Sequence, residues 1–115
     1  MARLFYVHWN RNEALEAVRA LRAARHEVRY EHEDGARVWA LVKADPPDVL
    51  VVSLDRLPSH GRRTAAVTKQ VKALRTLPVV FVGGEEAKVD VARKEFPKAA
   101  FCSAEKLLES LRKLT

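Results

Sequence analysis

The stretch PPDVLVVSL, residues 46–54, decides the fold. Its two prolines end the preceding helical segment. The residues that follow them are mostly apolar and β-branched, and polar residues do not alternate with them. A strand of this kind is buried on both faces, which is typical of the centre of a parallel sheet. The run PVVFVGG, residues 78–84, has the same character and predicts a second central strand.

Strand and helix patterns alternate on both sides of this stretch. We expect strands over 3–8, 27–32, 48–54, 78–84 and 99–102, and helices over 12–25, 36–44, 62–76, 85–96 and 103–114. Parallel strands joined by helices require right-handed crossovers, and the alternating strand 27–32 belongs at an edge. The sequence therefore predicts one α/β domain over residues 1–115. Its fold is three-layered and flavodoxin-like, a (βα)5 arrangement around a five-stranded parallel sheet of order 2-1-3-4-5.

Local patterns predict details of the helices and loops. Asn12 can cap the first helix, and Glu13 suits its first turn. Leu41 is expected to face inward from the second helix together with Val38 and Val42. Two charged residues and a serine, Asp55, Arg56 and Ser59, are expected to shape the loop after strand 48–54 through local hydrogen bonds.

The composition is that of a globular protein, with 48% hydrophobic and 31% charged residues and a formal net charge of +6. No apolar run approaches the roughly 20 residues that span a bilayer, and the N-terminal stretch lacks the pattern of a signal peptide. A single cysteine, Cys102, cannot form an intrachain disulfide, and no Cys/His spacing suggests a metal site. We therefore expect a cytoplasmic protein with no membrane partner, metal or cofactor.

The carboxyl ends of the strands meet at one crevice in this architecture, so any ligand should be sought there. The candidate residues are His8, Trp9, Asn10, Ser53, Asp55, Gly83 and Gly84. Trp9 can fill the crevice or stack on a planar ligand. The glycine pair can bring backbone N–H groups to an anion, although Glu85 and Glu86 would repel it and favour a plain helix start. No G-x-S-x-G motif accompanies Ser53, and we expect no catalytic residue.

The stretch PPDVLVVSLDRLPSHG…LPVVFVGG resembles the third strand, loop and fourth strand of response-regulator receiver domains. The family's phosphate-accepting Asp would fall at Ser53, and Gly61 and Pro78 match the family's spacing. The resemblance implies a receiver-like fold over nearly the whole chain.

The phosphorylation residues of that family are not matched. Its two acids after the first strand would fall at His8 and Trp9, or at Trp9 and Asn10, and its hydroxyl residue after the fourth strand at Gly83. Its fifth-strand Lys has no counterpart in residues 100–102. A two-residue shift would make Asp55 the acceptor, but no acid pair would then hold its metal. The resemblance therefore implies a degenerate receiver whose phosphorylation site is erased.

We predict a non-enzymatic, phosphorylation-independent regulatory or protein-interaction module of signal transduction. The resemblance implies an interface for a protein partner or a homodimer on helix 4, strand 5 and helix 5. The candidate interface residues are Lys88, Val91, Phe101, Lys106 and Glu109.

Two other functions are weighed. A cobalamin- or nucleotide-type ligand could use the crevice, since His8 and the glycine pair match cobalamin modules, whereas Tyr6 and Arg11 do not. Nucleic acid could use the positive charge, but no recognition-helix motif or aromatic stacking platform accompanies it.

Overall fold

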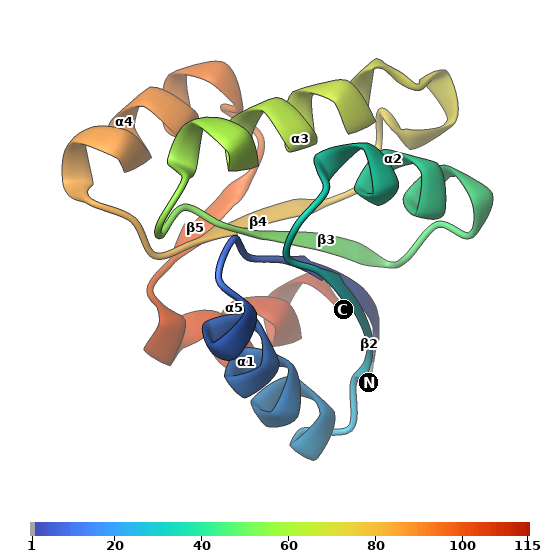
Figure 1. Ribbon diagram of the computed structural model, residues 1–115, viewed down its shortest axis with the longest axis vertical. Coiled ribbons are helices and arrows are strands. Elements are labelled where there is room, and N and C mark those ends of the chain that lie inside the picture. The colour runs from blue at the N-terminus through green and yellow to red at the C-terminus, as the bar shows by residue number, and fades with distance from the viewer. Residues whose placement is uncertain (1) are drawn as a thin grey trace.

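The computed structural model describes residues 2–115. Its five strands are all parallel and lie in the order β2-β1-β3-β4-β5, which confirms the predicted topology (Figure 1). Their bounds are β1 Arg3–Val7, β2 Glu27–Glu31, β3 Val49–Ser53, β4 Val79–Val82 and β5 Ala100–Cys102. Every residue of β3 and β4 is buried, as expected for uninterrupted apolar strands inside a parallel sheet.

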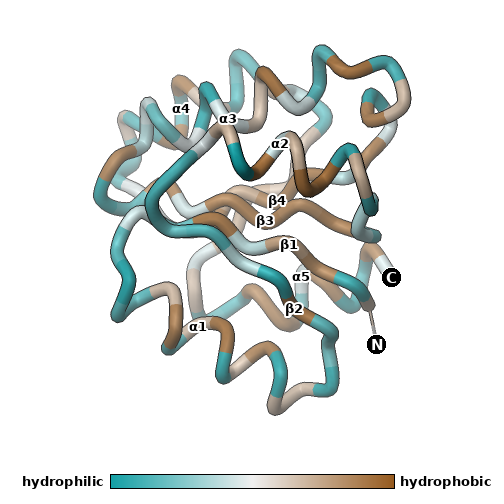
Figure 2. Tube along the Cα trace, turned by 45° about the vertical axis from the view of Figure 1, so that its right-hand side comes forward, coloured by the Kyte–Doolittle hydropathy of each residue, from teal (hydrophilic) through white to brown (hydrophobic). Residues whose placement is uncertain are grey.

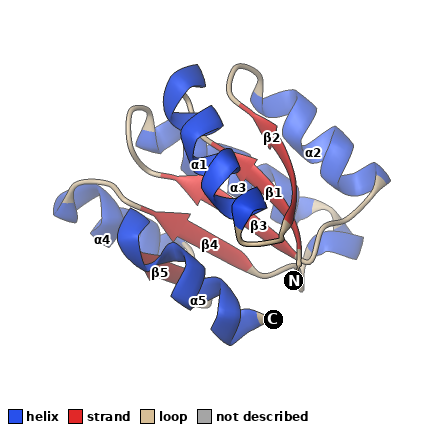
Figure 3. Ribbon diagram, turned by 90° about the horizontal axis from the view of Figure 1, so that it is seen from below, coloured by secondary structure: helices blue, strands red, loops and turns tan. Residues whose placement is uncertain are grey.

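The helices form a layer on each face of the sheet. Their bounds are α1 Arg11–Ala23, α2 Gly35–Ala44, α3 Pro58–Gln70, α4 Glu86–Glu95 and α5 Leu107–Leu114. Helices α1 and α5 cover one face, whereas α2, α3 and α4 cover the other, as Figures 1 and 3 show. No helix within residues 2–115 has both the length and the apolar character needed to cross a bilayer.

The sheet divides the interior into two hydrophobic cores. Successive residues of a strand point to opposite faces, so Leu4 and Tyr6 pack toward α1 and α5, whereas Phe5 and Val7 pack toward the other three helices. Figure 2 shows the hydrophobic central strands enclosed by helices whose outer sides are largely hydrophilic.

The third helix differs from the prediction of 62–76. It begins at Pro58, because proline is well suited to the first helical position, and therefore contains Ser59 and His60. It ends at Gln70 and is followed by a separate 3₁₀ turn, Lys72–Leu74. The expectation that Ser59 shapes a loop is therefore wrong, because this residue lies in the first turn of α3.

Two further local expectations were wrong. The cap of α1 is Asn10, whose side chain accepts a hydrogen bond from the Glu13 N–H at 3.0 Å, so the helix begins one residue before Asn12. Leu41 is 45% exposed. The reason is the helical period: Val38 and Val42 face the sheet one turn apart, and Leu41 lies about 100° around the helix from Val42.

Candidate functional site

The residues predicted for the crevice follow the carboxyl ends of β1, β3 and β4. Val7 of β1 pairs with Val52 of β3, so His8 and Ser53 lie at the same level of the sheet. Ser53 in turn pairs with Val82, which places Gly83 just beyond it. The topology thus brings the ends of these three strands together, as the sequence predicted.

Ser53 is fully buried, with a relative exposure of 0%. Its hydroxyl oxygen accepts a hydrogen bond from the Asp55 N–H at 3.1 Å. The side chain therefore holds the first turn after β3 and presents no hydroxyl group to solvent.

Asp55 joins the β3–α3 connection to the β4–α4 connection. Its Oδ1 accepts a hydrogen bond from the Gly84 N–H at 2.9 Å. Gly83 and Gly84 have φ angles of +71° and +91°, and a Cβ on Gly83 would lie 2.5 Å from Asp55 Oδ2. The left-handed backbone favours glycine at 83, and the close carboxylate leaves no room there for a side chain. The anion that meets this glycine pair is the protein's own Asp55.

A hydrogen-bonded chain of four side chains links β1, α1 and the β3–α3 connection, and its members are Tyr6, His8, Glu13 and Arg56. His8 is 6% exposed; its Nδ1 lies 2.9 Å from the Tyr6 hydroxyl oxygen and its Nε2 lies 2.9 Å from Glu13 Oε1. With a hydrogen on Nε2, the His8 ring donates to Glu13 and its Nδ1 accepts from the Tyr6 hydroxyl group. Arg56 Nε–H donates to Glu13 Oε1 at 3.1 Å, and its Nη2 group bonds the other carboxylate oxygen.

This chain changes the ionisation of its members. The hydrogen bond from Arg56, followed by that from His8, lowers the pKa of Glu13 to about 2. Burial, followed by the negative charges of Asp55 and Glu13, raises the pKa of Tyr6 above its ordinary value. The carboxylates of Glu13 and Asp55 therefore already accept hydrogen bonds within the protein, from Arg56 and from the Gly84 N–H respectively.

The seven crevice candidates do not line one cavity. Asn10 caps α1. His8 and Asp55 line a pocket of about 380 Å³ between α1 and α5, whereas Trp9 lines one of about 370 Å³ between α2 and α3. Gly83 and Gly84 border a third hollow, of about 270 Å³, beside β5. Among residues 2–115, no three His, Cys, Asp or Glu side chains come together as a metal site would require.

The local sequence patterns do not indicate the roles of Glu13 and Arg56. They predict only that Glu13 suits a helix start and that Arg56 shapes a loop. A usable signal was present, since opposite charges follow two strands that the predicted order makes neighbours. Arg56 has a positive φ of 72°, which the sequence does not indicate because glycine and asparagine, and not arginine, are typical of that conformation.

The predicted interface residues lie beside the edge strand β5, where α4, β5 and α5 adjoin (Figure 3). Val91 is 44% exposed and Lys88 is exposed. Phe101 is half-buried beneath the Arg93 guanidinium, whose carbon lies 4.7 Å from the ring centroid. Lys106 and Glu109 form an exposed ion pair at 3.8 Å.

The strand order and the helices on both faces form a flavodoxin-like α/β fold, and comparison with solved structures shows the same fold in receiver domains. The chemotaxis protein CheY4 of Vibrio cholerae superposes with a TM-score of 0.82 at 16% identity, over 100% of this chain and 99% of that one. The signal receiver domain of a modulated diguanylate cyclase from Desulfovibrio desulfuricans gives 0.76 at 18% identity, over 99% and 93%. A two-component response regulator of the LuxR family from Aurantimonas sp. gives 0.78 at 16% identity, over 99% and 84%.

No family model and no curated protein sequence matches the chain. At these identities the structural likeness establishes the fold, which is that of response-regulator receiver domains.

Proposed function

We propose that this chain is a receiver-like regulatory module that works without phosphorylation and without catalysis, by binding a protein partner or a second copy of itself. The binding surface is the α4–β5–α5 face, and the setting is the cytoplasm. The observation that carries the proposal is the exposed apolar side chain of Val91 on α4, together with the half-buried Phe101 of the edge strand β5.

The chemistry of the strand ends supports independence from phosphate. Phosphoryl transfer on receiver domains uses Mg²⁺, which prefers oxygen ligands and usually carboxylates. His8 and Trp9 offer no oxygen ligand, Glu13 is bound by Arg56, and Asp55 is bound by the Gly84 N–H. These residues do not fit the metal of the family, and the buried Ser53 hydroxyl does not fit its phosphate acceptor.

The composition of the α4–β5–α5 face supports protein binding. Val91 is 44% exposed, and the Arg93 guanidinium carbon lies 4.7 Å from the centroid of the Phe101 ring. Protein interfaces combine apolar centres with arginine and aromatic side chains, and hot spots favour the same residues. β5 is only three residues long and lies at the edge of the sheet, so its outer backbone groups have no strand partner.

The binding surface is tested by site-specific photocrosslinking in cells. p-Benzoylphenylalanine placed at Val91 should give one dominant crosslinked species, which mass spectrometry identifies as a defined protein or as the chain itself. The same amino acid at Leu41, which is 45% exposed on α2, is the matched control and should not give that species. Equal crosslinking from both positions, or none from Val91, would contradict the proposed surface.

Independence from phosphate is tested separately. Incubation with acetyl phosphate and Mg²⁺, followed by intact-mass measurement, should add no phosphate to the protein. Peptide mapping should find Ser53 and Asp55 unmodified. A stoichiometric mass gain of one phosphate at either residue would refute this half of the proposal and leave the interface unaffected.

A further inference from the structure

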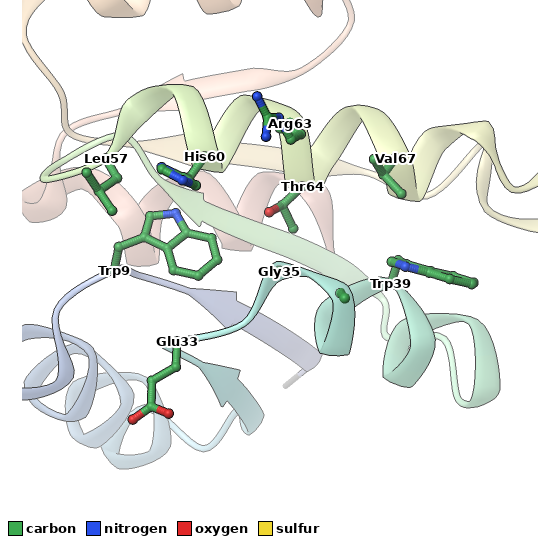
Figure 4. A pocket seen from close by; sticks show the side chains of 10 residues that line it. Trp9, Glu33, Gly35, Trp39, Leu57, His60, Arg63, Thr64 and Val67 are labelled. Atoms are coloured by element: carbon green, nitrogen blue, oxygen red, sulfur yellow. The ribbon is translucent and has the colours of Figure 1, made fainter.

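The pocket between α2 and α3 has the features of a small-molecule site. Its volume of about 370 Å³ falls within the range of about 300–1,000 Å³ that is usual for such sites. Most of its lining is apolar, and it contains both tryptophans of the chain, Trp9 and Trp39. In Figure 4 the two rings lie toward opposite ends of the pocket, with Gly35 and Thr64 between them.

Gly35 brings α2 and α3 into close contact in the middle of this pocket. A Cβ on Gly35 would lie 2.9 Å from Thr64 Oγ1 and 3.6 Å from the Trp9 ring, so a larger residue would force the two helices apart. Ala36 follows on the same wall and is exposed. The flat indole side chains on either side of this contact suit a planar ring.

One polar group in the pocket lacks a partner. The indole nitrogen of Trp9 is buried and forms no hydrogen bond with any residue of the range 2–115. A buried donor without an acceptor carries a free-energy penalty of about 1–3 kcal/mol, which an acceptor on a ligand would remove. The His60 ring lies edge-on to Trp9 at a centroid distance of 6.0 Å, and His60 is exposed, so an acceptor that reaches the nitrogen would have to displace this side chain (Figure 4).

The charge around the pocket favours an anion. Arg63 lines it and forms no ion pair within the described residues, and Lys43 lies 5.8 Å from the Trp39 ring centroid. The one acid in the lining, Glu33, lies 3.7 Å from His32, and its carboxylate points away from Thr64 and Trp39 in Figure 4. An acceptor that is also negatively charged would therefore meet the indole N–H and a cationic rim.

We infer that the α2–α3 pocket binds a small planar aromatic carboxylate. The ring lies in the apolar pocket between the two tryptophans, and the carboxylate accepts the Trp9 N–H. The site is separate from the α4–β5–α5 face and does not depend on the function proposed for that face.

The test uses the two indole N–H resonances of the ¹⁵N-labelled full chain, since the chain contains only two tryptophans. Titration with 1-naphthoate should shift the Trp9 indole proton downfield as it accepts a hydrogen bond, and should perturb the Trp39 resonance at the same midpoint. Cyclohexanecarboxylate, which lacks the aromatic ring, and 1-naphthylmethylamine, which reverses the charge, should each bind at least tenfold more weakly.

Variants separate binding in the pocket from other causes. Trp9→Phe keeps a ring but removes the N–H, and should weaken binding by about tenfold or more, the effect of one hydrogen bond to a charged group. Ala36→Leu should fill the pocket and weaken binding more than tenfold, whereas Ala44→Leu, at an exposed position of the same helix outside the pocket, should leave it unchanged. Circular dichroism verifies that each variant is folded.

The inference is overturned if neither indole resonance moves at millimolar 1-naphthoate. It is also overturned if the two control ligands bind equally well, or if Ala36→Leu and Ala44→Leu have the same effect.

Discussion

Replacing Gly83 by alanine should destabilise the protein by about 2–3.5 kcal/mol. The left-handed backbone, with a φ of +71°, accounts for about 1–2 kcal/mol of this for a residue with a side chain. The new Cβ would lie 2.5 Å from Asp55 Oδ2, so the carboxylate has to move and release the Gly84 N–H. Loss of that hydrogen bond adds about 1–1.5 kcal/mol.

A double-mutant cycle separates the two contributions. In an Asp55→Ala background no carboxylate is present to be displaced, so Gly83→Ala should then cost only the backbone part, about 1–2 kcal/mol. Urea unfolding followed by circular dichroism gives the free energy of unfolding of the four proteins. The expected coupling between the two positions is about 1–1.5 kcal/mol, in the range seen for residues in contact.

Two results would refute this reasoning. If Gly83→Ala costs the same free energy in both backgrounds, the Asp55 carboxylate does not occupy the space beside Gly83. If the substitution costs less than about 0.5 kcal/mol in the wild type, the backbone at this position is not restricted to the left-handed region.

Two other predictions concern ionisation and packing. Because the pKa of Glu13 is lowered to about 2, its ionised form contributes stability above its ordinary pKa of 4.5, and this contribution is lost as the pH falls toward 2. Arg56→Gln should move the NMR-observed titration of the Glu13 carboxyl carbon toward 4.5 and flatten that pH dependence, and an unchanged titration would exclude Arg56 as the cause. Leu111→Ala, at a fully buried position, should reduce the free energy of unfolding by about 2–5 kcal/mol. Leu108→Ala, at a position that is 40% exposed, should cost less than about 1 kcal/mol, and equal losses in urea unfolding would contradict the packing of α5.

The candidate site was only partly predictable from the sequence. The residues at the strand ends were found because parallel strands bring their carboxyl ends to one edge of a sheet. Their contacts were not found, because they depend on side chains from different connections meeting in space. Asp55 reaches Gly84 across 29 positions of sequence, and Arg56 reaches Glu13 across 43. The position of Trp9 between α2 and α3, rather than in a shared crevice, likewise depends on how those helices pack.

The sequence by itself determined the class of fold and the order of the strands. Uninterrupted apolar runs such as Val49–Val52 can be buried only inside a sheet that is covered on both faces. The alternation of polar and apolar residues in β2 places that strand at an edge of the sheet. Tertiary structure alone decided what the strand ends can do. Ser53 is buried, the two nearby carboxylates are bound by Arg56 and a backbone N–H, and the open pocket lies between two helices. The physical reason is that hydrophobic periodicity is encoded locally, whereas hydrogen bonding and cavities arise from groups that only the packed chain brings together.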